Sequence, residues 1–351
     1  MKKMLFISAH YPSPNAKFAG HKTAYMFLEQ YSKEYVVDLI VLCNKDEIDK
    51  ESVKRLANVN LVNIVVLDKY QKIKNILTAK NIFPLKVNSR FDVSTLNYLK
   101  LNISIYDTLY FEFTHAAVFL PKLQPYINKK QNVIISSHDV LFQNSYRSFD
   151  KSNSLLSLFD SRATYLYEKA IYNIANEIIV QSPKDKSLVE LLYDLKEKKV
   201  TVKSPALSSF VYSVKRRREE ELIEKKSLLF WGAMNREENE TAVLEFLKLY
   251  HNVIIEKDYK LYIVGNKPSQ KLLQLQSKNI IVTGFVEDPS EYFIKAELGI
   301  VPLISGAGIK VKTLEMLECG LNVISTPIGA EGIEHNKLKV TSLDKFGEIL
   351  K

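Results

Sequence analysis

The chain has 351 residues, of which 46% are hydrophobic and 25% charged, a composition typical of a folded globular protein. At roughly 100–200 residues per domain this length predicts two domains, and the lack of any run of about 18 apolar residues argues against a membrane-spanning helix. The formal net charge of +9 favours anionic partners: phosphorylated ligands, nucleic acid or an anionic membrane face. Cys43 and Cys319 lie in apolar segments, so we expect buried thiols, no disulfide framework and a reducing compartment.

The first half alternates short apolar runs with amphipathic segments. Its runs rich in Val and Ile predict buried strands of a parallel sheet that is covered on both faces. These strands are Met4–Ser8, Val36–Leu42, Val62–Leu67, Thr108–Phe113, Val133–Ser136 and Glu177–Gln181. Ser182 and Pro183 predict the start of a helix over Lys184–Lys196, with serine as the N-cap and proline in the first turn. The spacing of four leucines predicts its apolar stripe, which is Leu188, Leu191, Leu192 and Leu195.

A polar segment, Lys203–Lys226, separates the two halves and contains the charged run Lys215–Glu221. Acidic residues follow the basic ones directly, and opposite signs cancel a sustained phosphate-binding field. We therefore expect a solvated connector at the domain boundary rather than a nucleic-acid site.

The second half repeats the alternation of strand and helix, which predicts a second doubly wound α/β domain. The predicted strands are Ser227–Trp231, Lys260–Val264, Ile280–Thr283, Leu298–Val301 and Asn322–Ser325. The predicted helices are Glu240–Tyr250, Ser269–Gln276, Pro289–Ala296 and Lys312–Cys319. Of the 11 glycines, nine lie between Gly232 and Gly332, where strand-to-helix loops would approach a ligand closely.

The segment Pro302–Glu315 has the composition of an anion site. A strand is predicted to end at Pro302, a loop with Gly306 and Gly308 follows, and a helix is predicted from about Lys312. Unpaired amides and the positive end of the helix dipole would face that loop. Lys310 and Lys312 add positive charge, and Glu315 lies one turn further on, where a carboxylate can accept bonds from ribose hydroxyls. The alternative is a structural turn with a surface Lys–Glu pair.

Three segments in this order resemble the GT4 family of retaining GT-B glycosyltransferases. They are Ile280–Pro289, Pro302–Glu315 and Glu318–Ile333, and Leu229–Asn239 is similar to the family's first C-terminal strand and loop. In the first half, His10–Pro12 with Phe18–His21 resembles the family's first strand and glycine loop. Ser137–Val140 is similar to its His-Asp element, and Gln181–Asp185 to the opening of its last N-domain helix.

The resemblance implies a GT-B fold of α/β class, in which two Rossmann-like doubly wound domains face each other across a cleft. Residues 1–205 would form the acceptor-binding domain, residues 206–340 the nucleotide-sugar-binding domain, and residues 341–351 a C-terminal helix. The cleft would hold the donor and exclude water on closure.

The resemblance also implies a role for individual residues. Glu315 would bind the donor ribose, while Lys310, Lys312 and the amides near Gly306–Ile309 would hold the diphosphate; the catalytic set would be His138, Glu315 and Lys310. Gly284, Phe285 and Val286 would edge the nucleobase pocket. The full donor-binding set would be Gly20, Arg236, Gly284, Phe285, Val286, Gly306, Gly308, Ile309, Lys310, Lys312, Thr313 and Glu315. His138 would lie near the transferred sugar; a satisfied structural histidine is the alternative. The sequence departs from the family at Ala307, where a sugar-binding glutamate is usual, so donor identity is open.

The implied reaction is hexosyl transfer from a nucleoside diphosphate sugar to an acceptor hydroxyl with retention, in surface polysaccharide or glycoconjugate biosynthesis. No metal-ligand spacing is visible, so we expect no cofactor and no metal, with lysines and helix amides stabilising the leaving group. The alternatives are an epimerase or phosphorylase of the same architecture, or a non-catalytic nucleotide-sugar-binding subunit. A nucleic-acid partner is not expected, because a sustained basic stripe with stacking aromatics is missing. A dinucleotide-dependent oxidoreductase is disfavoured, because the first strand-to-helix turn lacks G-x-G-x-x-G.

The acceptor, whether carbohydrate, lipid-linked or protein, is left open. Residues 68–100 are rich in lysine and apolar side chains. Such a stretch is either a peripheral contact with the inner face of a membrane, suited to a lipid-linked acceptor, or a helix with its apolar stripe inward. The location expected is cytoplasmic in both cases.

Overall fold

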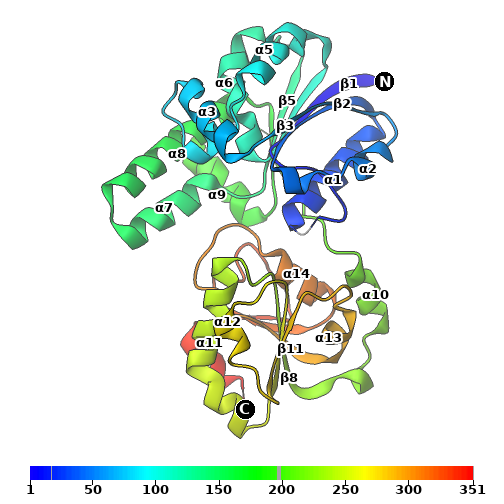
Figure 1. The fold of residues 1–351 in the computed structure, drawn as a ribbon, viewed down its shortest axis with the longest axis vertical. Helices are drawn as coiled ribbons and strands as arrows, with labels where there is room; N and C mark the ends of the chain where they lie inside the picture. Colours follow the sequence, from blue (N-terminus) through cyan, green and yellow to red (C-terminus); the bar gives the residue numbers. More distant parts are fainter. Residues whose placement is uncertain (17, 196–198, 351) are drawn as a thin grey trace. The chain divides into compact units, whose positions relative to one another are not determined.

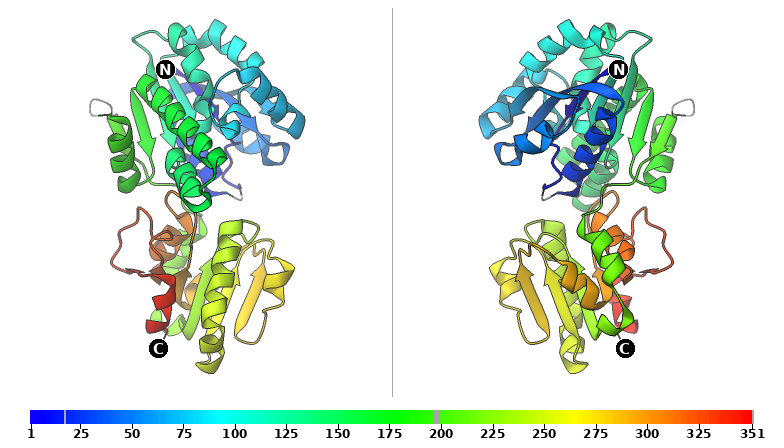
Figure 2. Two further views of the ribbon diagram at one scale, coloured as in Figure 1. Left: turned by 90° about the vertical axis from the view of Figure 1, so that its left-hand side faces the viewer. Right: turned by 90° about the vertical axis from the view of Figure 1, so that its right-hand side faces the viewer.

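The structure is a computed structural model that describes residues 1–16, 18–195 and 199–350. The chain forms two compact units, Met1–Ala206 and Leu207–Lys351. Each unit is one parallel sheet with helices on both faces (Figures 1 and 2). The prediction of two doubly wound α/β domains is confirmed.

The N-terminal unit is built on seven parallel strands. They are β1 (Lys2–Ser8), β2 (Tyr35–Cys43), β3 (Val59–Val66), β4 (Thr108–Glu112), β5 (Asn132–Ser137), β6 (Glu177–Val180) and β7 (Lys199–Val202), in the order β3-β2-β1-β4-β5-β6-β7. Its α-helices are α1 (Ala19–Ser32), α2 (Lys50–Lys54), α3 (Lys69–Ala79), α4 (Leu85–Asn88), α5 (Val93–Asn102), α6 (Leu120–Leu123), α7 (Leu141–Ser152), α8 (Leu155–Ile174) and α9 (Pro183–Tyr193). Short 3-10 helices are η1 (Lys45–Glu47), η2 (Ile103–Ile105), η3 (Thr114–Phe119) and η4 (Gln124–Tyr126).

The two faces of this sheet carry separate cores because successive strand residues point to opposite sides. In β1, Met4 and Phe6 pack with α1 and α2, whereas Leu5 and Ile7 belong to the larger core under α3, α5, α6, α8 and α9. Figure 1 shows α1 and α2 on one side of the sheet and α3, α5, α6 and α8 on the other. Both layers hold the carboxyl ends of β1, β4 and β5 in fixed positions.

The C-terminal unit is built on six parallel strands. They are β8 (Glu224–Trp231), β9 (Lys260–Val264), β10 (Ile280–Gly284), β11 (Ala296–Val301), β12 (Asn322–Ser325) and β13 (Leu338–Val340), in the order β10-β9-β8-β11-β12-β13. The helices are α10 (Phe210–Arg217), α11 (Glu237–Glu256), α12 (Gln270–Leu273), α13 (Ser290–Lys295) and α14 (Val311–Glu318), with 3-10 helices η5 (Glu220–Leu222) and η6 (Leu343–Glu348). Renumbered from one, this order is 3-2-1-4-5-6, the order of dinucleotide-binding Rossmann folds.

Three expectations need correction. The charged run is exposed except at Arg218, as expected, but it is not a plain connector: Lys215–Arg217 form the last turn of α10, and Arg218 donates to the carbonyls of Ile294 and Ala296 at 2.8 Å each. The predicted C-terminal helix 341–351 is only the 3-10 helix η6. Leu191 does not belong to the apolar stripe of α9, because it is 82% exposed. The predicted end of that helix, Lys196, lies outside the described residues.

The cysteines agree with the sequence prediction. Both Cys43 and Cys319 are free and buried, and burial raises the pKa of each thiol to about 12. Within the described residues, no helix is long and apolar enough to cross a bilayer.

Candidate functional site

The C-terminal sheet places two loops at the point where its strand order reverses. β8 and β11 are neighbours at the centre of the sheet, and their chains leave in opposite directions. In open α/β sheets, ligands bind at the carboxyl ends of the strands at this switch point. The loop after β8 carries Gly232 and Arg236, and the loop after β11 carries residues 302–310 and leads into α14.

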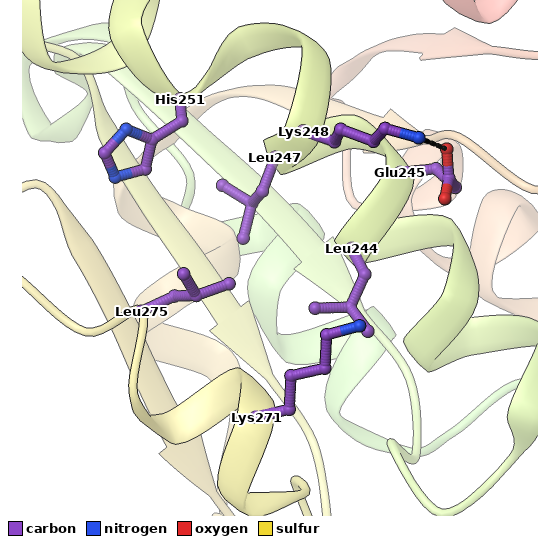
Figure 3. A pocket seen from close by; sticks show the side chains of 7 residues that line it. All are labelled: Leu244, Glu245, Leu247, Lys248, His251, Lys271 and Leu275. Carbon is purple, nitrogen blue, oxygen red and sulfur yellow. Dashed lines mark ion pairs between the residues drawn. The ribbon is translucent and has the colours of Figure 1, made fainter.

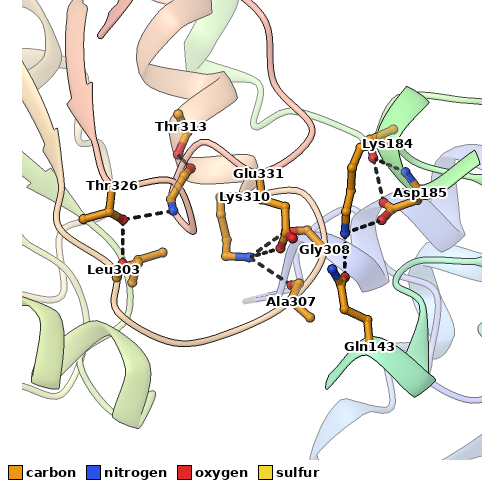
Figure 4. A network of polar contacts seen from close by, with 12 residues as sticks. Gln143, Lys184, Asp185, Leu303, Ala307, Gly308, Lys310, Thr313, Thr326 and Glu331 are labelled. Carbon is orange, nitrogen blue, oxygen red and sulfur yellow. Dashed lines mark hydrogen bonds and ion pairs between the residues drawn. The ribbon is translucent and has the colours of Figure 1, made fainter. Parts of the chain in front are cut away.

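The loop before α14 depends on two glycines and one lysine. Gly306 (φ +119°) and Gly308 (φ +70°) adopt left-handed conformations that favour glycine. The Lys310 ammonium donates to the carbonyls of Ala307 (3.0 Å) and Gly308 (2.6 Å), and it lies 3.9 Å from the Glu331 carboxylate. Figure 4 shows Lys310 folded back onto its own loop in this way. In this conformation Lys310 braces the loop that carries the amides at the start of α14.

Lys312 lies in the first turn of α14 and points towards the loop after β8. Its ammonium donates to the Asn239 side chain and lies 4.9 Å from the centre of the Phe230 ring. A Cβ atom added to Gly232 would come within 2.9 Å of the same ammonium and of the Asn239 side chain, so a larger residue there would have to displace both side chains. Burial, and then the neighbouring Arg236, lower the pKa of Lys312 to about 7.

The cations at this switch point lie close enough to oppose one another. Both Arg236 and Lys310 lower the pKa of Lys312, although Glu238 and Glu315 act in the other direction. Arg236 is the N-cap of α11, and its Nε lies 2.8 Å from the Glu238 carboxylate. Converging cations beside a helix N-terminus are the electrostatics of an anion site, because a bound anion removes their repulsion.

Glu315 faces the interior from the second turn of α14. Its Oε1 accepts from the Ser208 amide at 2.9 Å and its Oε2 from the Trp231 indole N–H at 2.8 Å, and the residue is 5% exposed. A carboxylate offers roughly four acceptor positions, so two remain for a hydroxyl ligand. Sequence reasoning missed Ser208 and Trp231 as the groups that orient this carboxylate.

Thr313 has a structural contact. Its buried hydroxyl donates to the Gly329 carbonyl at 2.8 Å, and the Gly329 amide in turn donates to the Thr326 hydroxyl at 3.2 Å. This network, drawn in Figure 4, connects α14 to the loop after β12. The hydroxyl of Thr313 is therefore used to hold the helix.

The segment predicted to border the nucleobase, Gly284–Val286, follows β10, at the carboxyl ends of the strands of the same sheet. Apart from its two chain neighbours, none of the residues that the structure describes comes within 4 Å of a Cβ atom added to Gly284 (φ +70°), and Phe285 is 71% exposed. Val286 packs against the core beside α13. An open backbone next to an exposed ring suits stacking with a planar ligand.

The switch point of the N-terminal unit lies between β1 and β4, and the side chains near it are a histidine, a carboxylate and an aromatic ring. His138 follows β5, and its Nε2 lies 2.5 Å from Oε1 of the fully buried Glu112 at the end of β4. With Nε2–H donating to Glu112, Nδ1 is the nitrogen left to act on a ligand. The His138 ring stacks on Phe113, with ring centres 4.0 Å apart.

The backbone of Phe113 and the close approach of Gly20 shape the space around this stack. Phe113 has φ +65°, a costly conformation for a residue with a side chain, and such strain concentrates at functional sites. A Cβ atom on Gly20 would lie 3.0 Å from the Phe113 ring and 3.3 Å from His138 Nδ1. The structure thus brings Gly20 and His138 together, and it adds Glu112 and Phe113, which sequence reasoning did not select as site residues.

A second histidine cluster lies beside this pair. Potential ligand atoms of His10, His21 and Glu47 lie within 4.8 Å of one another, a grouping that the sequence spacing did not reveal. His10 Nδ1 is 3.0 Å from Glu47, and its Nε2 is 3.3 Å from the Arg90 guanidinium. Burial lowers the pKa of His21 to about 4. For Glu47, burial alone would raise the pKa, but the hydrogen bond with His10 outweighs burial, and the pKa falls to about 2. The positive charge of Arg90 beside His10 would repel a bound metal ion. A hydrogen-bonded network therefore fits these residues better than a metal site.

A surface hollow between α11 and α12 is separate from the switch point. It is lined by Leu244, Glu245, Leu247, Lys248, His251, Lys271 and Leu275 (Figure 3). The leucines form its wall, and Lys248 is paired with Glu245 at 3.7 Å. Its first lining residue on α11, Leu244, lies about two turns beyond Arg236.

The fold is of the GT-B type, as comparison with known proteins shows. Sucrose-phosphate synthase from Thermosynechococcus elongatus superposes with a TM-score of 0.66 at 12% identity, covering 99% of this chain and 88% of that one. The Anabaena protein HepE in complex with UDP and glucose gives 0.60 at 12% identity, covering 100% and 89%. The lipopolysaccharide outer core galactosyltransferase WaaB gives 0.60 at 12% identity, covering 99% and 88%.

Two sequence comparisons concern the chain itself. Residues 225–348 match the family described as glycosyl transferases group 1. A Klebsiella pneumoniae protein described as an uncharacterized 44.6 kDa protein in the cps region is 26% identical over 356 residues, covering 96% of this chain and 86% of that protein. The family match and the fold together support a glycosyltransferase of the GT-B superfamily.

Proposed function

We propose that the protein transfers a sugar from a nucleoside diphosphate sugar to an acceptor hydroxyl, with retention at the anomeric carbon. The observation that carries the proposal is the convergence of Lys312, Arg236 and Lys310 on the start of α14, with the pKa of Lys312 lowered to about 7. A bound diphosphate supplies the negative charge that neutralises these three cations. The group 1 glycosyltransferase match covers all of these residues.

Each group has a role in this proposal. The amides at Gly306–Ile309, Lys312 and Arg236 stabilise the leaving diphosphate, and Lys310 holds the loop in shape. Glu315 accepts from the ribose hydroxyls while the segment Gly284–Val286 borders the base. The bond between the anomeric carbon and the diphosphate breaks, the acceptor oxygen bonds to that carbon, and the acceptor proton passes to the leaving diphosphate. Catalysis then comes from positioning and electrostatics.

His138 is proposed to act on the transferred sugar. Glu112 fixes the orientation and tautomer of the ring, so that Nδ1 meets the substrate. Gly20 contributes by leaving room beside that nitrogen. No cofactor and no metal ion are needed in this scheme.

The acceptor side of the proposal is a surface polysaccharide or glycoconjugate precursor. The cps-region relative supports this choice, and HepE, crystallised with UDP and glucose, makes UDP the first nucleotide to test. We also propose a cytoplasmic location with peripheral contact at the inner face of the membrane.

A binding screen tests the donor proposal. Thermal shifts are measured with the nucleoside diphosphates of uracil, guanine, adenine and thymine and with their sugars, and one nucleotide is expected to raise the Tm. Transfer with that donor, followed by NMR of the product anomeric configuration, then tests retention. Finding no stabilisation by any of these compounds rejects the donor site, and an inverted product rejects retention alone.

A further inference from the structure

Helix α3 presents an apolar stripe to solvent. Tyr70, Ile73 and Leu77 follow the helical period and are 78%, 50% and 73% exposed. The following turn continues the stripe with Ile82 and Leu85, which are also exposed. These five side chains form what we call the α3 face, on an outer helix of the N-terminal unit (Figure 1).

The inward side of α3 is polar or small, which is the reverse of an ordinary surface helix. Asn75 and Ala79 are its buried residues, and they lie about 180° around the helix from the exposed stripe. The Asn75 amide donates to the Ser89 carbonyl at 2.9 Å, and Gln71 donates to Asn75 at 2.8 Å and to Asp92 at 3.3 Å. These hydrogen bonds fix the rotation of α3 about its own axis, and the apolar stripe on the opposite side of the helix therefore faces solvent.

Lysines border the stripe without any acid among them. Between residues 69 and 91 the sequence contains no Asp or Glu. Lys69, Lys74, Lys80 and Lys86 are exposed, and none of them forms an ion pair with a residue that the structure describes. Lysine stems can cover apolar surface while their ammonium groups reach past it.

A second apolar patch has a different charge pattern. Leu155, Leu156 and Phe159 are exposed where the α7–α8 hairpin turns. There, the acids Asp150 and Asp160 lie close in sequence to Lys151. Of these two patches, the α3 face is the one whose lysines have no acidic residue among them.

We propose that the α3 face binds the surface of an anionic phospholipid bilayer. A cationic amphipathic helix that exposes apolar side chains lies in the plane of a membrane interface, where apolar burial adds to attraction by anionic headgroups. A second copy of this chain is a poor occupant, because it would bring two sets of unpaired lysines together. Charge complementarity favours the anionic surface.

The position of α3 suggests a function for the contact between the α3 face and the bilayer. This function rests on the transferase activity proposed above. The helix begins shortly after β3 ends, at the carboxyl edge of the sheet. Lys72 donates to Asn44 at 2.8 Å, Asn44 donates to Glu47 at 2.5 Å, and Glu47 bonds to His10. A bilayer held by α3 thus presents a lipid-linked acceptor at the edge of the sheet that carries His138.

Vesicle flotation with the full-length protein tests the inference. Vesicles of phosphatidylcholine alone are compared with vesicles that also contain phosphatidylglycerol, and binding is expected only to the second. The variant Lys69→Gln/Lys74→Gln is expected to bind about 30-fold more weakly, from the usual contribution of two surface lysines. Ile73→Ser/Leu77→Ser is expected to lose at least about tenfold.

The matched control removes apolar side chains from the other patch. Leu155→Ser/Leu156→Ser is expected to retain binding to the anionic vesicles, and circular dichroism checks that all variants are folded. No flotation, equal binding to both vesicle types, or loss of binding only in the hairpin variant overturns the inference. Nucleotide binding is measured on the same samples: a protein that floats but binds no nucleotide loses the donor proposal and keeps this one, and the reverse result rejects this one alone.

Discussion

The two switch points of this molecule have the same topology and opposite chemistry. In the C-terminal unit, the loops after β8 and β11 gather cations around the start of α14. In the N-terminal unit, the ends of β1, β4 and β5 gather imidazoles, a buried carboxylate and the Phe113 ring. A Rossmann-like sheet supplies only the position of a site, so the side chains in the loops decide its chemistry. The comparison predicts that C-terminal variants change donor affinity and N-terminal variants change turnover.

The largest effect is expected from the N-terminal side. His138→Asn should lower kcat about 10²–10³-fold, the usual cost of removing one positioned polar group from a transition state. Donor affinity, measured by calorimetry, should stay within about twofold of wild type. Equal losses in kcat and donor affinity would contradict the division between the two units.

Glu112→Gln serves as the companion variant because it keeps size and removes charge. The glutamine can still accept from His138 Nε2, but the hydrogen bond loses its charge assistance and holds the ring less firmly. We expect a smaller loss in kcat than in His138→Asn, with donor affinity unchanged. A kcat equal to that of wild type would assign Glu112 a packing role.

The next effect is expected at Lys312. Lys312→Met should weaken binding of the donor about 10- to 100-fold, because a charge-assisted hydrogen bond to phosphate is lost. The same variant should be more stable near neutral pH, by about 2–4 °C in Tm, because methionine has no charge to desolvate. Lys271→Met, on α12 and away from the switch point, is the control and should change neither quantity. Lower stability together with unchanged affinity would show that Lys312 is structural.

The pH dependence of donor binding should be smaller but more specific. The pKa of Lys312 is about 7 in the free protein, and a bound diphosphate raises that pKa. At pH 8 the side chain is mostly neutral before binding and protonated afterwards, so binding takes up as much as one proton. Affinity should therefore fall as pH rises above about 7, by up to about tenfold per unit, and level off below pH 6.

Calorimetry in buffers of different ionisation enthalpy measures this proton uptake directly. A nucleoside diphosphate sugar is the right probe, because its diphosphate has no ionisation of its own near neutral pH. Lys312→Met should remove the uptake. Uptake that persists in the variant would assign the proton to another group.

The sequence predicted what is local or periodic. The start of α14 lies within one residue of its predicted position, because the glycine loop and the helix are contiguous in the chain. Contacts between distant segments were missed, such as Trp231 with Glu315 and Glu112 with His138. The edge strands β7 and β13 were missed because most of their residues are not buried, so neither strand contains a continuous apolar run. The sequence did not predict whether the apolar stripe of α3 faces solvent or the core. Periodicity places a stripe on one side of a helix, but it does not say which side packs against the protein.

The smallest effect separates a residue that touches the donor from one that holds the helix. Thr313 was predicted to bind the donor, yet its hydroxyl donates to the Gly329 carbonyl in the interior. Thr313→Val keeps the shape and removes that hydrogen bond, so the free energy of unfolding should fall by about 1–2 kcal/mol in urea denaturation. Thr313→Ser, which keeps the hydroxyl, is the control for that bond. Donor affinity in the valine variant should remain close to that of wild type, because the backbone amides of α14 do not depend on the hydroxyl. A tenfold loss of affinity without loss of stability would return Thr313 to the set of groups that contact the diphosphate.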